Sequence, residues 1–300
     1  MNELVDMGEL VKSARNGNFS QESSNDLISS ALARLWNNCS QNGLSISNDD
    51  IFEIRAARSS AGELVDDFFA RILETASVRQ SNLLKQSNIK YISIGEDCFS
   101  RTLLTRWGIK PPAKFSENSH PFDLAIHPLA SIVSLLRSDF ENYLNPNFLI
   151  FDERQNICIN NKMNIHFNHE KGRDYCDNNF KKLQETYKRR IGNFYKDLDF
   201  SGEIIFVLHV RHPNLETDKY ISEIYGEISR LRGDNPWSMR VICTWPNGKK
   251  IIMCDRGLGK VRRLDINYPF DNYIWYNEMH ASSRMGFDFE KEIISNLFMI

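Results

Sequence analysis

The spacing of the apolar residues divides the chain at about residue 88. Before that point the apolar positions recur at helical spacing, and one face of a predicted helix carries Leu27, Ile28, Ala31, Leu32 and Leu35. A second run of this kind covers residues 60–85. We predict three or four helices in residues 1–88 and interpret this N-terminal region as one that packs on the rest of the chain or mediates protein–protein contact or oligomerisation.

Beyond residue 88 short β-type runs alternate with helical stretches. The run IIFVLHV within residues 203–210 is continuously apolar, which is typical of a buried central strand. Further strands are expected at 91–95, 240–245, 249–254 and 261–266, with two or three more between 148 and 167. Helices are expected at 99–107, 129–143, 179–197, 218–232 and 287–298. The alternation predicts an α/β domain over residues 89–300, with a mostly parallel sheet and helices on both faces.

A turn of three residues separates two of these strands. Pro246, Asn247 and Gly248 stand between the strands at 240–245 and 249–254. Turn residues at this spacing predict that the two strands pair as a hairpin.

Cys98 stands where chemistry is expected in such a sheet, because ligands bind at the carboxyl ends of parallel strands. It follows the strand at 91–95 and directly precedes a predicted helix. The dipole and N–H groups of a helix N-terminus stabilise a thiolate and can bind an oxyanion. Glu96 and Asp97 act against this, since nearby negative charge raises a thiol pKa. Cys98 is therefore either a nucleophile or a small buried residue.

Three further side chains are candidate partners of a nucleophilic thiol. Asp123 follows a proline-fixed turn and could orient a histidine or bind a substrate group. His166 and His169 belong to an extended run, and a catalytic base must come within hydrogen-bond reach of the thiol. Each of the three could equally have a structural role.

Basic residues and one late histidine form a second group of candidates. Arg189 and Arg190 lie in a predicted helix and could hold an anionic group or form a solvated face. Arg211 follows the apolar strand together with His209 and His212, at the edge where ligands bind. His280, near the end of the chain, is an alternative base.

Composition excludes several classes of protein. The 300 residues are 41% hydrophobic and 25% charged, with a formal net charge of −2, so a packed core is expected and charge-driven binding to nucleic acid or membranes is not. No apolar run approaches the length of a membrane span, and the N-terminal residues lack the apolar segment of a secretory signal. The six cysteines include no C-x-x-C pair and are interpreted as free thiols of a cytoplasmic protein.

Sequence motifs for bound groups are absent as well. The chain has no phosphate loop, no G-x-G-x-x-G and no H-E-x-x-H. We therefore expect no cofactor and no metal, and a substrate that is an unidentified small molecule, acyl compound or peptide.

Four motifs follow one another in a fixed order: Tyr91-Ile-Ser-Ile-Gly-Glu-Asp-Cys98, Ser119-His-Pro-Phe-Asp123, Ile165-His-Phe-Asn-His-Glu170 and Tyr187-Lys-Arg-Arg-Ile-Gly-Asn-Phe194. Together they resemble a bacterial family of papain-like cysteine peptidase domains of unknown function. The likeness is strong over residues 89–211 and loose beyond them. Leu124 stands where the family pattern has tryptophan, and Glu170 where it has aspartate.

The resemblance implies Cys98 as nucleophile, His169 as base and Asp123 as its carboxylate partner, in a cysteine-dependent hydrolase or acyltransferase. A nucleophile directly after the first strand is also similar to the SGNH-type hydrolases, in which the base comes late; that similarity favours His280. Two other functions stay open. One is a transferase or binding protein for a sugar or nucleotide-sugar, with Arg189, Arg190 and Arg211 holding anionic groups. The other is an interaction module that acts through the N-terminal helices.

Overall fold

The computed structural model describes Arg71 and residues 89–110, 118–246, 248, 253–254 and 259–298. The helices expected in residues 1–88 and the domain boundary at residue 88 lie outside the part that is described. The described residues fall into two compact units. The larger contains residues 89–104, 118–246, 248, 253–254, 259–268 and 293–298. The smaller contains Arg71 and residues 105–110 and 269–292.

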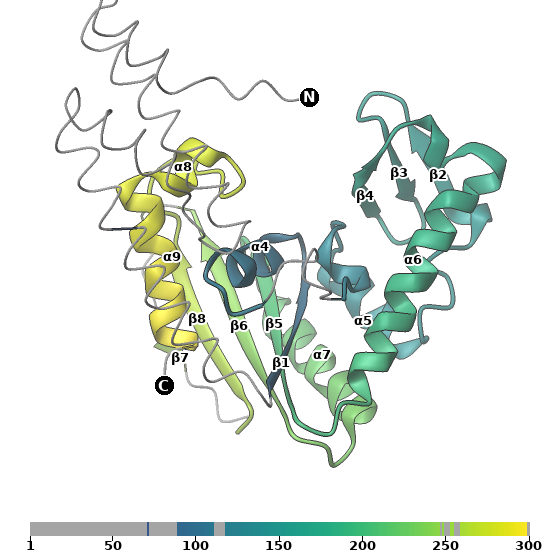
Figure 1. Cartoon of the computed structure of the whole chain (residues 1–300). Helices are drawn as coiled ribbons and strands as arrows, with labels where there is room; N and C mark the ends of the chain where they lie inside the picture. The colour runs from purple at the N-terminus through teal and green to yellow at the C-terminus, as the bar shows by residue number, and fades with distance from the viewer. Residues whose placement is uncertain are drawn as a thin grey trace, which may run out of the picture. The chain divides into compact units, whose positions relative to one another are not determined.

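A five-stranded sheet forms the centre of the larger unit (Figure 1), in the order β1-β5-β6-β8-β7. Four strands are parallel: β1 (Ile89–Gly95), β5 (Glu203–Arg211), β6 (Trp237–Trp245) and β8 (Val261–Asn267). The short β7 (Met253–Cys254) is antiparallel to β8. The mixed α/β class with a parallel sheet is thereby confirmed, and β1 is an edge strand.

The hairpin predicted around Pro246 is wrong. Residues Met239 to Trp245 of β6 pair with β8 in parallel, so β8 occupies the edge that a hairpin partner would need. β7 pairs with the far edge of β8 instead. Turn residues therefore marked the end of a strand here but not its neighbour in the sheet.

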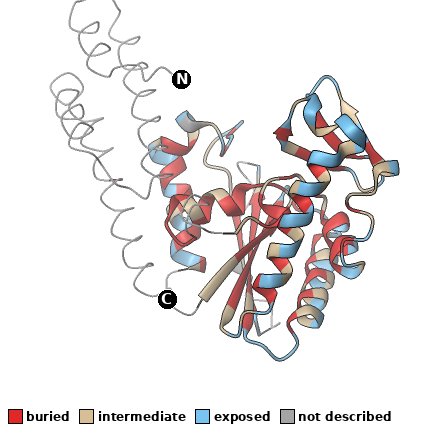
Figure 2. Ribbon diagram, turned by 45° about the vertical axis from the view of Figure 1, so that its right-hand side comes forward, coloured by how far each residue is buried: buried red, intermediate tan, exposed pale blue. Residues whose placement is uncertain are grey.

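Both faces of the sheet are buried, as the uninterrupted apolar run predicted (Figure 2). On β5, Ile204, Phe206, Leu208 and Val210 pack in the main hydrophobic core, which includes residues of α5 (Leu129–Arg137), α6 (Asp177–Leu198) and α7 (Thr217–Arg232). The alternate position His209 faces the other way, where its ring contacts Phe99 of α4 (Phe99–Arg106) with centroids 4.6 Å apart. The helix α5 ends at Arg137 and is therefore shorter than the helix expected at 129–143. It ends there because Asp139 and Phe140 have φ of 50° and 63°, which a right-handed helix does not allow.

A second, antiparallel sheet is inserted between β1 and β5. Its strands are β2 (Leu149–Asp152), β3 (Ile157–Asn160) and β4 (Ile165–Lys171), in that order. Residue Ile126, in the segment after β1, forms a bridge to His166 of β4 with N···O distances of 2.9 and 3.1 Å. The bridge ties the small sheet to the segment that follows the Cys98 turn.

The smaller unit contains α8 (Glu278–Ser282) and the first part of α9 (Arg284–Leu297). Its interior is organised by Glu290, which is 1% exposed. The carboxylate pairs with Arg106 and accepts a 2.9 Å hydrogen bond from the Trp107 indole. None of the helices within the described ranges is long and apolar enough to span a membrane.

Gly95 is expected to tolerate no side chain. A Cβ at this position would come within 3.0 Å of the His209 backbone nitrogen and 3.1 Å of its carbonyl oxygen on the paired strand. We expect Gly95→Ala to lower the free energy of unfolding by about 1–3 kcal/mol in chemical denaturation. Gly226→Ala, in α7 with open space around the position, is the matched control and is expected to be neutral or stabilising. Equal stability of the two variants would contradict this account.

Candidate active site

Cys98 and His169 lie side by side at the carboxyl end of β1. Cys98 directly precedes α4, and His169 lies near the end of β4. The Sγ of Cys98 is 3.2 Å from Nε2 of His169, although the residues are 71 positions apart in the chain. This is within hydrogen-bond distance for a sulfur atom, so a thiol and an imidazole come together as a nucleophile and a base require.

A bulge in β4 turns His169 toward the thiol. Cys158 of β3 pairs with Phe167, but the preceding Ile157 pairs with Lys171, so residues 168–170 bulge out of the ladder. In a regular strand Phe167 and His169 would share a face. Here Phe167 and Glu170 are both buried and His169 is exposed.

Glu170 is held in the interior by two side chains of α6. Its carboxylate accepts a 2.8 Å hydrogen bond from the Tyr187 hydroxyl and a 2.8 Å contact from Arg190 Nη2. Glu170 is 3% exposed and Arg190 8%. Since Glu170 is next to His169 in the chain, this buried cluster fixes the end of the bulge and with it the position of the imidazole.

The protonation states indicate a neutral pair. Burial, together with the charges of Asp97 and Asp123, raises the pKa of the Cys98 thiol to about 12. Desolvation by the surrounding protein lowers the pKa of His169. At neutral pH the site therefore holds a thiol beside an uncharged imidazole, rather than the thiolate that the helix N-terminus alone would favour.

Asp97 fixes the turn that carries the thiol. Its Oδ1 lies 2.7 Å from Nδ1 of His209 and accepts a 3.0 Å hydrogen bond from the Phe99 N–H. Burial alone would raise the pKa of Asp97, but the charge and hydrogen bond of His209 lower it. Nε2 of His209 is 3.0 Å from the Thr244 hydroxyl. The sequence indicated Asp97 only as a charge near the thiol. Because Asp97 and His209 both stand at the carboxyl ends of apolar strands, their contact could have been predicted had the two strands been recognised as neighbours.

The charge of Asp123 acts on the Cys98 thiol, whereas its contacts are with other residues. Its Oδ2 accepts a 2.8 Å hydrogen bond from the His120 N–H and is 3.5 Å from Arg101 Nη1. Among the described residues, the Cys98 thiol is the hydrogen-bond partner that the His169 ring has. The described contacts include no hydrogen bond between Asp123 and His169, and the orienting role that the resemblance implies for Asp123 stays a prediction.

The remaining candidates are dispersed. Arg190 is engaged by Glu170, whereas Arg189, its neighbour on α6, is exposed. Arg211 has its Nε 3.7 Å from Asp97 Oδ2. His280 belongs to the smaller unit, where its Nδ1 accepts a 3.0 Å hydrogen bond from the Ile274 N–H. No group of three or more metal-ligating side chains occurs in the part of the chain that the structure describes.

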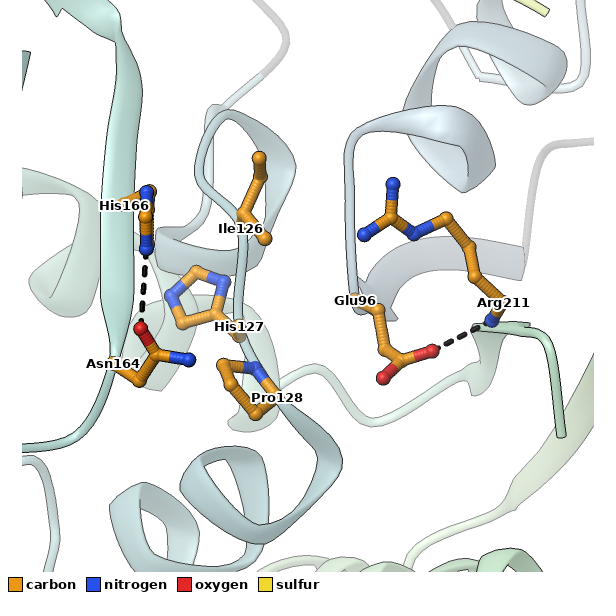
Figure 3. Close-up of a pocket in the computed structure, with 7 residues that line it drawn as sticks. All are labelled: Glu96, Ile126, His127, Pro128, Asn164, His166 and Arg211. Atoms are coloured by element: carbon orange, nitrogen blue, oxygen red, sulfur yellow. Dashed lines mark hydrogen bonds between the residues drawn. The ribbon is translucent and has the colours of Figure 1, made fainter. Parts of the chain in front are cut away.

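A cavity of about 300 Å³ is lined by Glu96, which stands two residues before Cys98, and by His166, which lies in the same strand as His169. Figure 3 shows Glu96 and Arg211 on one side of it and the other lining residues opposite. These are Ile126, His127, Pro128, Asn164 and His166. Nε2 of His166 is 3.2 Å from Oδ1 of Asn164, so this histidine faces the cavity rather than the thiol.

Comparison with known proteins supports the resemblance seen in the sequence. Residues 89–231 match a family model described as "putative papain-like cysteine peptidase". The matched segment begins with β1 and ends in α7, so it includes Cys98, the inserted sheet with His169, and the anchoring residues of α6. No curated protein and no solved structure matches the chain.

Proposed function

We propose that this protein is a cysteine-dependent hydrolase or acyltransferase in which Cys98 is the nucleophile and His169 the general base. The observation that supports this most directly is the 3.2 Å separation of thiol and imidazole at the carboxyl end of β1. The match of residues 89–231 to a cysteine peptidase family supports the same reaction class.

The neutral state of the pair decides how the reaction begins. As Sγ bonds to the substrate carbonyl carbon, the thiol proton passes to Nε2 of His169, and the carbonyl oxygen becomes an oxyanion. Backbone N–H groups in the first turn of α4 stabilise that charge, with the dipole of the helix adding to them. Asp97 accepts the Phe99 N–H and so keeps this turn in place.

Collapse of the intermediate leaves a thioester on Cys98. The imidazolium returns its proton to the departing amine, alcohol or thiol, and the carbonyl is restored. For hydrolysis, His169 then takes a proton from water as the water oxygen bonds to the thioester carbon, the C–S bond breaks, and the imidazolium returns the proton to Sγ of Cys98. For transfer, an alcohol, amine or thiol acceptor takes the place of water.

The experiment is acylation by 4-nitrophenyl acetate, which gives an acetyl thioester and releases 4-nitrophenolate. Peptide mass spectrometry locates the acetyl group, and absorbance follows its rate of formation. We expect acetylation at Cys98 first, and a fall of at least about 100-fold in nitrophenolate release in Cys98→Ser.

Cys176 is the control within the same molecule, because it is a partly exposed free thiol away from any imidazole contact that the described residues make. Acetylation of Cys176 as fast as Cys98 would contradict the proposal. Binding of a sugar or nucleotide-sugar that survives Cys98→Ser would favour the alternative. No contact among the described residues gathers Arg189, Arg190 and Arg211 into one site for such a ligand.

A further inference from the structure

The cavity shares its elements with the Cys–His pair. Glu96 lies in the same turn as Cys98, and His166 lies in the same strand as His169. A group bound in the cavity would therefore lie close to the turn and the strand that carry the pair. Its volume of about 300 Å³ is at the lower end of the range for small-molecule sites, which suits one substituent rather than a whole large ligand.

Glu96 brings a carboxylate to this cavity without a cation of its own. Its Oε2 accepts a 2.6 Å hydrogen bond from the Arg211 N–H. Within the described residues no ammonium or guanidinium forms an ion pair with it, since the Arg211 guanidinium lies nearest to Asp97. Figure 3 shows the Glu96 carboxylate with one oxygen joined to the Arg211 N–H.

The other polar groups around the cavity do not neutralise Glu96. Burial lowers the pKa of His127 to about 3, so this ring is uncharged, and its Nε2 lies 2.9 Å from the Tyr143 hydroxyl. His166 lies 3.2 Å from the Asn164 amide oxygen. Burial raises the pKa of Glu96, and the Arg211 N–H and the charges of His209 and Arg211 offset that rise only in part. A cation that entered the cavity would supply a counter-ion in direct contact with the carboxylate.

We propose that this cavity is a substrate subsite that binds a primary ammonium group through the Glu96 carboxylate. The proposal rests on Cys98 being the reacting thiol, and it names the substrates as acyl compounds that carry an amine close to the scissile carbonyl. Arg211 and Asp97 form the neighbouring ion pair, which leaves Glu96 as the charge that selects for a cation. Ile126 and Pro128 supply the apolar surface for the carbon chain that bears the amine.

The test uses three methanethiosulfonates that differ only in charge: the 2-aminoethyl, 2-hydroxyethyl and 2-sulfonatoethyl reagents. In each, Sγ of Cys98 bonds to the thiosulfonate sulfur, methanesulfinate departs, and the thiol proton goes to His169. Peptide mass spectrometry gives the rate at Cys98. We expect the ratio of the aminoethyl to the hydroxyethyl rate to be about tenfold higher at Cys98 than at Cys176, and the sulfonatoethyl reagent to be slowest.

Glu96→Gln keeps the acceptor for the Arg211 N–H and removes the charge, so the ratio at Cys98 should fall to that of Cys176. Glu185→Gln, at an exposed position on α6, removes the same charge elsewhere and should leave the ratio unchanged. An unchanged ratio in Glu96→Gln would overturn the subsite while leaving the nucleophile in place. A second outcome is that the ratio of aminoethyl to hydroxyethyl rates at Cys98 stays high and depends on Glu96, while the hydroxyethyl reagent labels Cys98 no faster than Cys176. That outcome would overturn the nucleophile alone. A Cys98 that none of the reagents modifies would overturn both.

Discussion

Replacing His169 with alanine is expected to slow acetylation of Cys98 at pH 7 by about 10²- to 10⁴-fold. The thiol is uncharged at that pH because burial raises its pKa to about 12, so it reacts only if a neighbouring base removes its proton. The His169 imidazole, 3.2 Å from Sγ, is that base in the proposed mechanism. The measurement is the rate of nitrophenolate release at saturating reagent, with mass spectrometry of the Cys98 peptide.

The pH dependence separates this role from a structural one. Because desolvation lowers the pKa of His169, its imidazole stays neutral to a lower pH than an ordinary histidine. The wild-type rate should therefore hold at pH 7 and fall only below the ordinary histidine pKa of about 6.5. In His169→Ala the remaining rate should instead climb about tenfold per pH unit toward the pKa of the thiol, since only thiolate then reacts. His166→Ala removes a histidine from the same strand and is the control: the shape of its pH profile should stay that of the wild type, whatever the absolute rate. A His169→Ala profile identical to the wild type would rule out the base.

Arg190→Met is expected to lower the free energy of unfolding by about 3–5 kcal/mol. The Arg190 guanidinium is the cation 2.8 Å from the Glu170 carboxylate, and both side chains are buried. Methionine has a comparable reach but no charge, so it would leave an ionised carboxylate in the interior. Chemical denaturation measures this loss.

Two further variants make the result specific. Arg189→Met, at the exposed neighbouring position, should change stability by no more than about 0.5 kcal/mol. Adding Glu170→Gln to Arg190→Met removes the stranded charge and should restore most of the lost stability, while Tyr187 can still hydrogen-bond the amide. If the single and double variants are equally unstable, the Glu170–Arg190 pair is not what holds the bulge. Acetylation of Cys98 in the double variant then reports whether His169 keeps its place without the ion pair.

The positions of the strands and helices were largely predictable because they depend on local pattern. The apolar run in β5, the glycine at the end of β1 and the helical spacing of α7 each specify an element from neighbouring residues alone. The pairing of β6 with β8 was not predictable from local pattern. The neighbour of a strand depends on which strands share buried faces and not on the turn between two of them.

The sequence by itself determined that a cysteine stands at the junction of a strand and a helix, and that histidines and a carboxylate occur in motifs farther along. Only the tertiary structure decided that His169 rather than His166 faces the thiol, because a bulge reverses the alternation of β4. It also showed that Arg190 holds Glu170 and that the Asp123 carboxylate accepts the His120 N–H. The protonation of the pair was decided there as well, since a pKa depends on burial and on charges brought close by folding, and neither can be obtained from residue spacing.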